Sequence, residues 1–238
     1  IVLRRLDLVL EPTKDKVIQA AKEFKAKGIN DKALEKALSR VAVGAGRTQP
    51  LYNTSKFTFR KLLDDPDNIA SNLVSYIHAF SPRAKDIFDK FEFEAEIHRL
   101  DESERLYLII KEICAFDIDL SPKNISNMQM GYLFEELVRK FNEQANEEAG
   151  DHFTPREVIR LMVGLVFADE KDIYKKGIYK SIYDPTAGTG GMLSVSQEFI
   201  ERQNPDANIE LFGQEYNPES YAICCSDLLI KDEPIDNL

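Results

Sequence analysis

The pattern of hydrophobic and polar residues predicts that the first half of the chain is helical. Residues 1 to about 125 carry apolar stripes at helical spacing, together with several helix start signals. Asp65-Pro66 and Ser81-Pro82 each place a capping residue before a proline, which favours the first position of a helix. The dense apolar run from Leu106 to Ile110 predicts a helix that is buried.

The same pattern predicts a long helix from Asn127 to about Ala149, ended by Gly150. One side of this helix is acidic, and we interpret it as a solvated face. The other side forms an apolar stripe at three- and four-residue steps, made of Met130, Leu133, Phe134, Leu137 and Phe141. The segment Thr154-Pro155-Arg156-Glu157 then has the form of a capping box with proline at the first helical position, which predicts another helix.

The pattern changes in the last third of the chain, where short apolar runs alternate with helical stretches. Ser181-Ile182-Tyr183 and Ile209–Phe212 have the composition of buried strands, and a helix is predicted after each of them. This order of elements predicts an α/β Rossmann-like sheet. We therefore expect an α-helical N-terminal domain over residues 1–122, followed by the first part of an α/β domain over residues 123–238.

Charge is distributed unevenly along the 238 residues, whose net charge is −10. Residues 1–60 contain 13 Lys and Arg against 6 Asp and Glu, whereas the remaining residues contain 18 against 35. An acidic chain is not expected to grip DNA by itself. We interpret the basic part as a solvated face. The alternative is a surface that contacts phosphate or an acidic partner through Arg40, Arg47, Lys56, Arg60 and Lys61.

The composition, 43% hydrophobic and 30% charged, is typical of a soluble globular protein. No apolar run approaches the roughly 20 residues that cross a membrane. The N-terminus begins as if within a helix and lacks the apolar core of a signal peptide. From this N-terminus we expect the sequence to be a fragment. The three cysteines have no metal-binding spacing, so no metal site is expected. Their small number fits a reducing compartment, which predicts a cytoplasmic protein.

The run Asp184-Pro185-Thr186-Ala187-Gly188-Thr189-Gly190-Gly191 lies between the first predicted strand and its helix. A glycine turn there brings backbone N–H groups and the positive helix end to the sheet edge, where a ligand can touch the main chain. The carboxylate of Asp184 would repel a pyrophosphate but attract an ammonium group. No lysine follows the glycines, as a phosphate-binding Walker loop requires. The run therefore predicts a site for S-adenosylmethionine rather than for a nucleotide phosphate.

A second carboxylate, Glu215, follows the second predicted strand. In dinucleotide-binding folds an acidic residue at this place accepts hydrogen bonds from two ribose hydroxyls. Glu215 lies somewhat farther from the glycines than the roughly 20 residues usual in those folds. We favour the ribose-binding role over an ordinary loop carboxylate because the glycine run precedes it.

Three blocks of the sequence resemble the modification subunits of type I restriction–modification systems, a family of adenine-N6 DNA methyltransferases. In the family's order, these blocks are Gly150-Asp151-His152-Phe153-Thr154-Pro155-Arg156-Glu157, the run Asp184–Gly191, and Gly213-Gln214-Glu215-Tyr216-Asn217-Pro218. The preceding helical half is also similar to the family, through Leu3–Asp7, Tyr52–Ser55 and Gly131–Glu135. The resemblance covers essentially the whole chain.

This resemblance implies a methyltransferase domain that uses S-adenosyl-L-methionine as its cofactor. The residues expected to bind the cofactor are Asp151, His152, Phe153, Thr154, Pro155, Arg156, Asp184, Thr186, Ala187, Gly188, Thr189, Gly190 and Glu215. The resemblance also implies a complex with a restriction endonuclease subunit and a specificity subunit that reads double-stranded DNA. Two modification subunits are expected in each complex.

The family's catalytic Asn-Pro-Pro-Phe/Tyr motif, which holds and stacks on a flipped adenine, is absent because the chain contains no Pro-Pro dipeptide. The catalytic residues are therefore expected outside this sequence, and the fragment alone is expected to be inactive. Two alternatives stay open. One is a non-catalytic module that docks a specificity subunit, and the other is a methyltransferase that acts on RNA or protein.

Overall fold

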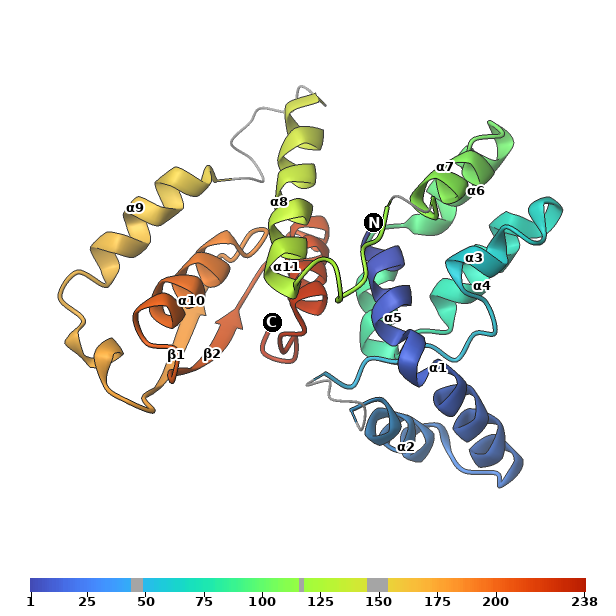
Figure 1. The fold of residues 1–238 in the computed structure, drawn as a ribbon, viewed down its shortest axis with the longest axis horizontal. Helices are drawn as coiled ribbons and strands as arrows, with labels where there is room; N and C mark the ends of the chain where they lie inside the picture. Colours follow the sequence, from blue (N-terminus) through green and yellow to red (C-terminus); the bar gives the residue numbers. More distant parts are fainter. Residues whose placement is uncertain (44–48, 116–117, 145–153) are drawn as a thin grey trace. The chain divides into compact units, whose positions relative to one another are not determined.

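The computed structural model describes residues 1–43, 49–115, 118–144 and 154–238, which form two compact units (Figure 1). The first, the helical unit, contains residues 1–132 and 230–233. The second, the α/β unit, contains residues 133–229 and 234–238. No helix in the described ranges is long and apolar enough to cross a membrane.

Helices build the helical unit, as the sequence pattern predicts. Asp65 precedes a 3-10 helix and Ser81 an α-helix, and both helices begin with a proline as predicted, but neither side chain makes a capping hydrogen bond. The helix that contains Leu106 and Ile110 buries only one side, because Leu108 on the same helix is 59% exposed. The elements of this part are α1 (Val2–Ala26), α2 (Asp31–Val43), α3 (Phe59–Leu62), η1 (Pro66–Asn68), α4 (Ile69–His78), α5 (Pro82–Asp89), α6 (Phe93–Glu102) and α7 (Leu106–Ile113).

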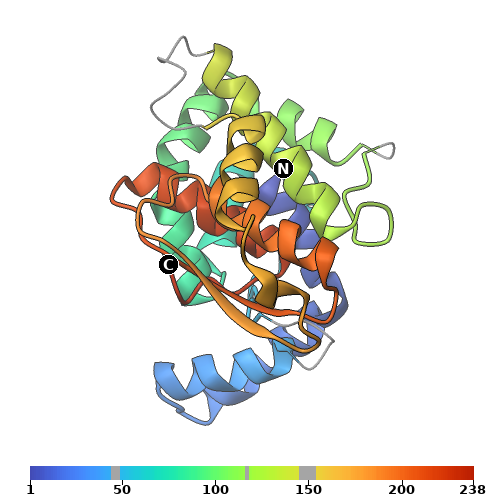
Figure 2. The ribbon, with the colours of Figure 1, turned by 90° about the vertical axis from the view of Figure 1, so that its left-hand side faces the viewer.

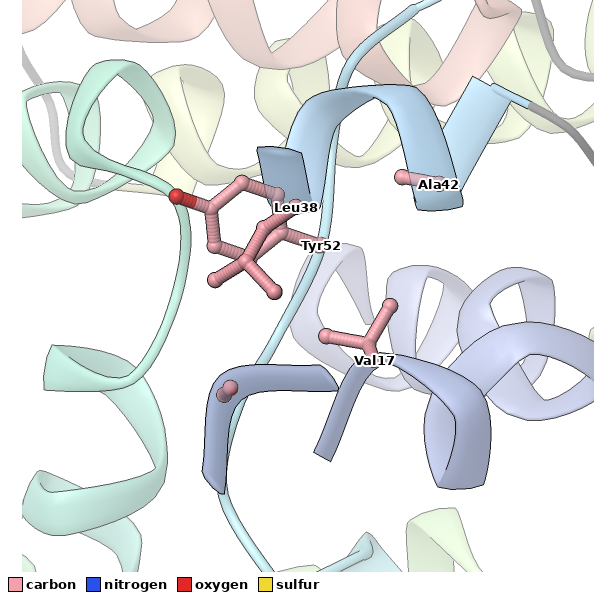
Figure 3. Packing of buried hydrophobic residues seen from close by; sticks show 5 residues of the cluster. Val17, Leu38, Ala42 and Tyr52 are labelled. Carbon is pink, nitrogen blue, oxygen red and sulfur yellow. The ribbon is translucent and has the colours of Figure 1, made fainter. Parts of the chain in front are cut away.

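Helices α1 and α2 pack on each other through a small apolar cluster (Figure 3). Val17 of α1 lies there against Leu38 and Ala42 of α2, and the ring of Tyr52 completes the cluster. Burial, and after it the negative charge of Glu35, raises the pKa of Tyr52 to about 12. The raised pKa reflects the cost of placing a charged phenolate among apolar side chains.

A buried carboxylate, Asp7 of α1, joins several parts of the helical unit. Its Oδ2 accepts hydrogen bonds from Arg4 at 2.9 Å and from the backbone N–H of Phe59 at 3.1 Å. Its Oδ1 accepts from the hydroxyl of Tyr76 at 3.3 Å. Burial, followed by the charge of Asp7 and this hydrogen bond, raises the pKa of Tyr76 well above its usual value. Asp7 therefore links α1 to α3 and α4 through hydrogen bonds that are buried from water.

Part of the basic excess of residues 1–60 is used inside the helical unit rather than on its surface. Arg5 is fully buried and donates to the carbonyl of Leu120 at 2.6 Å and to Oδ1 of Asn127 at 2.8 Å. Lys14, also buried, donates to the carbonyl of Phe57. Four of the side chains considered for a contact with phosphate are exposed, namely Arg40, Lys56, Arg60 and Lys61. The fifth, Arg47, lies outside the described residues.

The α/β unit contains the strand–helix–strand order that the sequence predicts. Strands β1 (Tyr179–Asp184) and β2 (Asn208–Gly213) pair in parallel, with Asp184 opposite Gly213. The helix between them, α10 (Gly191–Gln203), packs against both strands and against α9 (Arg156–Val166), as Figures 1 and 2 show. The remaining elements are α8 (Asn127–Gln144), which begins in the helical unit, η2 (Lys171–Tyr174) and α11 (Pro218–Lys231), which ends there.

The start of α9 differs from the predicted capping box. The helix begins at Arg156, its N-cap is Pro155 with an extended backbone (φ −54°, ψ 136°), and no side chain caps it. The carbonyl of Pro155 accepts the first helical hydrogen bonds, from Val158 at 3.0 Å and Ile159 at 3.1 Å. Since the helix starts one residue later than predicted, Thr154 does not occupy the capping position, and this prediction is wrong.

Replacing Asp7 by alanine should destabilise the chain by about 3 kcal/mol, because the change removes one partner of a buried ion pair and leaves Arg4 uncompensated. The matched control is Asp15→Ala on the same helix, where the side chain is exposed and the change should stay within about 0.5 kcal/mol. Urea unfolding of the 238-residue chain, followed by circular dichroism, measures both. Equal effects of the two substitutions would contradict the central role of Asp7.

Candidate functional site

The glycine turn follows β1 directly, and two of its glycines have a left-handed backbone. Gly188 has φ +54° and Gly190 has φ +87°, values that residues with a Cβ rarely adopt. Gly190 is the N-cap of α10, so the positive end of this helix faces the turn. The glycines therefore fix the path by which the chain leaves the sheet and enters the helix.

Main-chain hydrogen bonds tie this turn to the segment that follows β2. The N–H of Gln214 donates to the carbonyl of Asp184 at 2.9 Å, and the N–H of Ala187 donates to the carbonyl of Gln214 at 2.8 Å. Because the strands are parallel, their carboxyl ends meet at one edge of the sheet. Asp184 and Glu215, 31 positions apart in sequence, are consequently neighbours of one cavity.

Both carboxylates accept hydrogen bonds from backbone N–H groups. Oδ1 of Asp184 accepts from Thr186 at 3.0 Å. Glu215 accepts from Gly188 through Oε2 and from Asn217 through Oε1, each at 2.7 Å. An ionised carboxylate has about four acceptor sites, so these contacts leave lone pairs available for the donors of a ligand.

A cavity of about 340 Å³ opens at this edge of the α/β unit, within the size range of small-molecule sites. Four carboxylates line it: Asp184, Glu215, Glu135 of α8 and Asp227 of α11. None of its described lining residues is Lys, Arg or His. By Coulomb's law this set of charges attracts a cation and repels a phosphate group.

Most of the residues predicted from the sequence are brought together at this cavity. Those that line it are Thr154, Asp184, Thr186, Ala187, Gly188, Thr189, Gly190 and Glu215. Pro155 and Arg156 directly follow Thr154 but are not among the lining residues, and Asp151, His152 and Phe153 lie outside the described residues. The cofactor-binding role of all these residues stays a prediction.

Two helices, α8 and α11, contribute side chains to the cavity that the sequence pattern did not indicate. From α8 come Phe134, Glu135 and Val138, and from α11 come Ser220, Ile223 and Asp227. One signal was available, because Asp227 is a lone charge in the otherwise uncharged run Tyr221–Ile230. In the structure the hydroxyl of Ser194 on α10 donates to Oδ2 of Asp227 at 3.1 Å, which joins α10 to α11 at the cavity wall.

Behind the cavity, Arg156 lies between two carboxylates. Its Nη1 donates to Oε2 of Glu135 on α8, and its Nη2 donates to Oε2 of Glu198 on α10 at 2.5 Å. Glu198 also accepts from Arg202. Among the described residues, no group of three or more His, Cys, Asp or Glu side chains is arranged to hold a metal ion.

Two family models match the chain. The model described as HsdM N-terminal domain matches residues 1–113, and the model described as N-6 DNA Methylase matches residues 126–238. The first match lies in the helical part of the chain, and the second contains both strands.

The chain is also similar to individual methylase subunits of type I restriction enzymes. The type I restriction enzyme MjaIX methylase subunit of Methanocaldococcus jannaschii is 29% identical over 153 residues, which cover 64% of this chain and 25% of that protein. The HindI methylase subunit of Haemophilus influenzae is 24% identical over 103 residues, which cover 43% of this chain and 21% of that protein. The chain thus spans about a quarter or less of the length of these curated relatives.

A solved structure shows the same fold. The crystal structure of the type I restriction-modification system methyltransferase subunit from Streptococcus thermophilus matches with a TM-score of 0.63 and 18% sequence identity. The match covers 99% of this chain and 50% of that one. The expected fold, a helical N-terminal domain followed by part of an α/β methyltransferase domain, is confirmed.

Replacing Gly190 by alanine should destabilise the α/β unit in two ways. The left-handed backbone costs about 1–2 kcal/mol for a residue with a Cβ, and the new Cβ would lie 2.7 Å from Sγ of Cys224, which adds about 1–3 kcal/mol of overpacking. Gly177→Ala is the control, because its φ of +65° is left-handed but its surroundings are open. Urea unfolding should show the larger loss for Gly190→Ala, and the double change Gly190→Ala with Cys224→Ala should recover the packing part. No recovery would contradict this account.

Proposed function

Since this chain belongs to the family of type I restriction–modification methylase subunits, we propose that its cavity at the glycine turn binds S-adenosyl-L-methionine. The acidity of the cavity supports this proposal most directly. S-adenosylmethionine presents an ammonium and a sulfonium group, which are positive, and it has no phosphate. Four carboxylates with no cation among the described lining residues suit that ligand and disfavour a nucleotide phosphate.

Three parts of the cavity have distinct roles in this proposal. Asp184 binds the ammonium group of the methionine moiety. The backbone from Gly188 to Gly190, at the positive end of α10, approaches the carboxylate of the methionine moiety. Glu215 accepts hydrogen bonds from the ribose hydroxyls through the lone pairs that its bonds to Gly188 and Asn217 leave available.

For the whole protein we propose transfer of the methyl group to N6 of adenine in double-stranded DNA. This reaction requires the amine lone pair to be aligned with the sulfonium carbon, so it depends on positioning and electrostatics rather than on strong acid–base chemistry. The residues that hold the adenine lie outside this sequence in our proposal, because the chain has no Pro-Pro dipeptide.

We propose that the whole protein works in the cytoplasm, in a complex with a specificity subunit and a restriction endonuclease subunit. Two modification subunits are present in that complex. Division of labour with the specificity subunit accounts for the net charge of −10, which does not suit a chain that binds DNA alone.

In the full-length subunit, Asp184→Asn and Glu215→Gln should each weaken binding of S-adenosylmethionine by about 1.5–3 kcal/mol, because each removes a charge-assisted hydrogen bond. Isothermal titration calorimetry measures the affinity. Asp206→Asn, an exposed carboxylate in the loop after α10, is the control and should bind as the unsubstituted protein does. Unchanged affinity in both site variants would contradict the assignment of the cavity.

The 238-residue chain by itself should not methylate DNA. It has no Pro-Pro dipeptide, and the described part of its sheet has two strands, on which Tyr179 and Tyr183 are exposed. A parallel sheet is normally covered on both faces, so amide hydrogen exchange should show weak protection at Ile182 and Leu211. Methyl transfer by this chain to unmethylated DNA, compared with the full-length subunit in the same assay, would contradict the prediction.

A further inference from the structure

A single arginine joins the three helices whose residues form one wall of the cavity. Arg156 is the first residue of α9, and its two terminal nitrogens donate to different helices, to Glu135 of α8 and to Glu198 of α10. Its side chain is 16% exposed and that of Glu198 is 10% exposed, so water reaches these charges poorly. A planar guanidinium can hold two carboxylates at once, which the single ammonium of a lysine does less well.

Each of the three helices contributes directly to the cavity. Helix α8 supplies Glu135 and its neighbour Phe134, and α9 supplies Ile159. Helix α10 begins at the glycine turn and supplies Ser194. Arg156 is not a lining residue, but it bonds to Glu135, which is one. A displacement of α8 or α9 relative to α10 would therefore change the shape of the cavity at several points.

We infer that Arg156 is a positioning residue for the cofactor, which acts through Glu135 and Glu198 and does not touch the ligand. This inference rests on the proposed function of the cavity. Glu198 is equally important to it, although Glu198 does not line the cavity, because it anchors the arginine to α10. Arg202 donates to the other carboxylate oxygen of Glu198 and holds that anchor in place.

Two physical effects predict opposite results for the loss of Arg156. If only the electric field mattered, removal of a cation beside an acidic cavity would strengthen the binding of a cationic ligand. If position matters more, the helices shift and binding weakens, since hydrogen-bonding groups that no longer meet the ligand are left unpaired. The direction of the change therefore separates the two effects.

The test uses the full-length subunit and four single variants. Arg156→Ala removes both bonds, Arg156→Lys keeps the charge, and Glu198→Gln weakens the anchor on α10. Arg160→Ala, an exposed arginine on the same helix, is the matched control. Calorimetry gives the dissociation constant of S-adenosylmethionine, steady-state methyl transfer gives KM for the cofactor and kcat separately, and thermal melting without cofactor reports stability.

We expect Arg156→Ala to raise the dissociation constant and KM on the order of tenfold with a smaller change in kcat. Arg156→Lys should fall between this variant and the unsubstituted protein, and Arg160→Ala should not differ from it. Glu198→Gln should also raise the dissociation constant, and the double variant Arg156→Ala with Glu198→Gln should be no weaker than Arg156→Ala alone. Should Arg156→Ala fail to fold, Arg156→Lys and Glu198→Gln decide the question.

Three results would overturn the inference. Equal or tighter binding by Arg156→Ala would show that the bonds of Arg156 to Glu135 and Glu198 do not position the cavity. Weaker binding by Arg156→Ala with unchanged binding by Glu198→Gln would show that the bond to Glu198 on α10 does not position the cofactor, as the inference requires. Absence of binding by the unsubstituted full-length subunit would overturn the proposed function itself, and this inference with it.

Discussion

The arrangement of the candidate site depends on the hydrogen bonds that the carboxylate of Glu215 accepts. It accepts one hydrogen bond from Gly188, in the turn after β1, and one from Asn217, just before α11. These two bonds bring the ends of both strands and the start of a third element to one point. Gly188 has a left-handed backbone, which glycine adopts without the steric cost that a Cβ would add.

Buried or half-buried charged groups join separate elements in both units. In the helical unit Asp7 connects α1 with Phe59 and Tyr76, and in the α/β unit Arg156 connects α9 with Glu135 and Glu198. Apolar contacts tolerate small shifts, whereas an ion pair with directed hydrogen bonds has few good arrangements. Buried pairs of this kind add little net stability, but breaking one is costly, so they favour one packing over its alternatives.

The acidity of the cavity is also a property of the assembled unit. Asp184 and Glu215 are recognisable in sequence because Asp184 ends β1 and Glu215 lies two positions after the end of β2. Glu135 and Asp227 come from the middle of α8 and α11 and add half of the carboxylates. The preference for a cationic ligand therefore depends partly on helix side chains that only packing brings to the strand ends.

The sequence by itself determined the helical first half, both strands, the glycine turn and the two carboxylates at the strand ends, because these depend on local periodicity and backbone conformation. Tertiary structure alone decided which faces of α8 and α11 meet the cavity, since a helix exposes several faces and only packing selects one. It also decided the start of α9, where the carbonyl of Pro155 accepts the first helical hydrogen bonds and Thr154 does not cap the helix as its local sequence predicts. The partners of Arg156 are likewise tertiary, because its two carboxylates come from other helices.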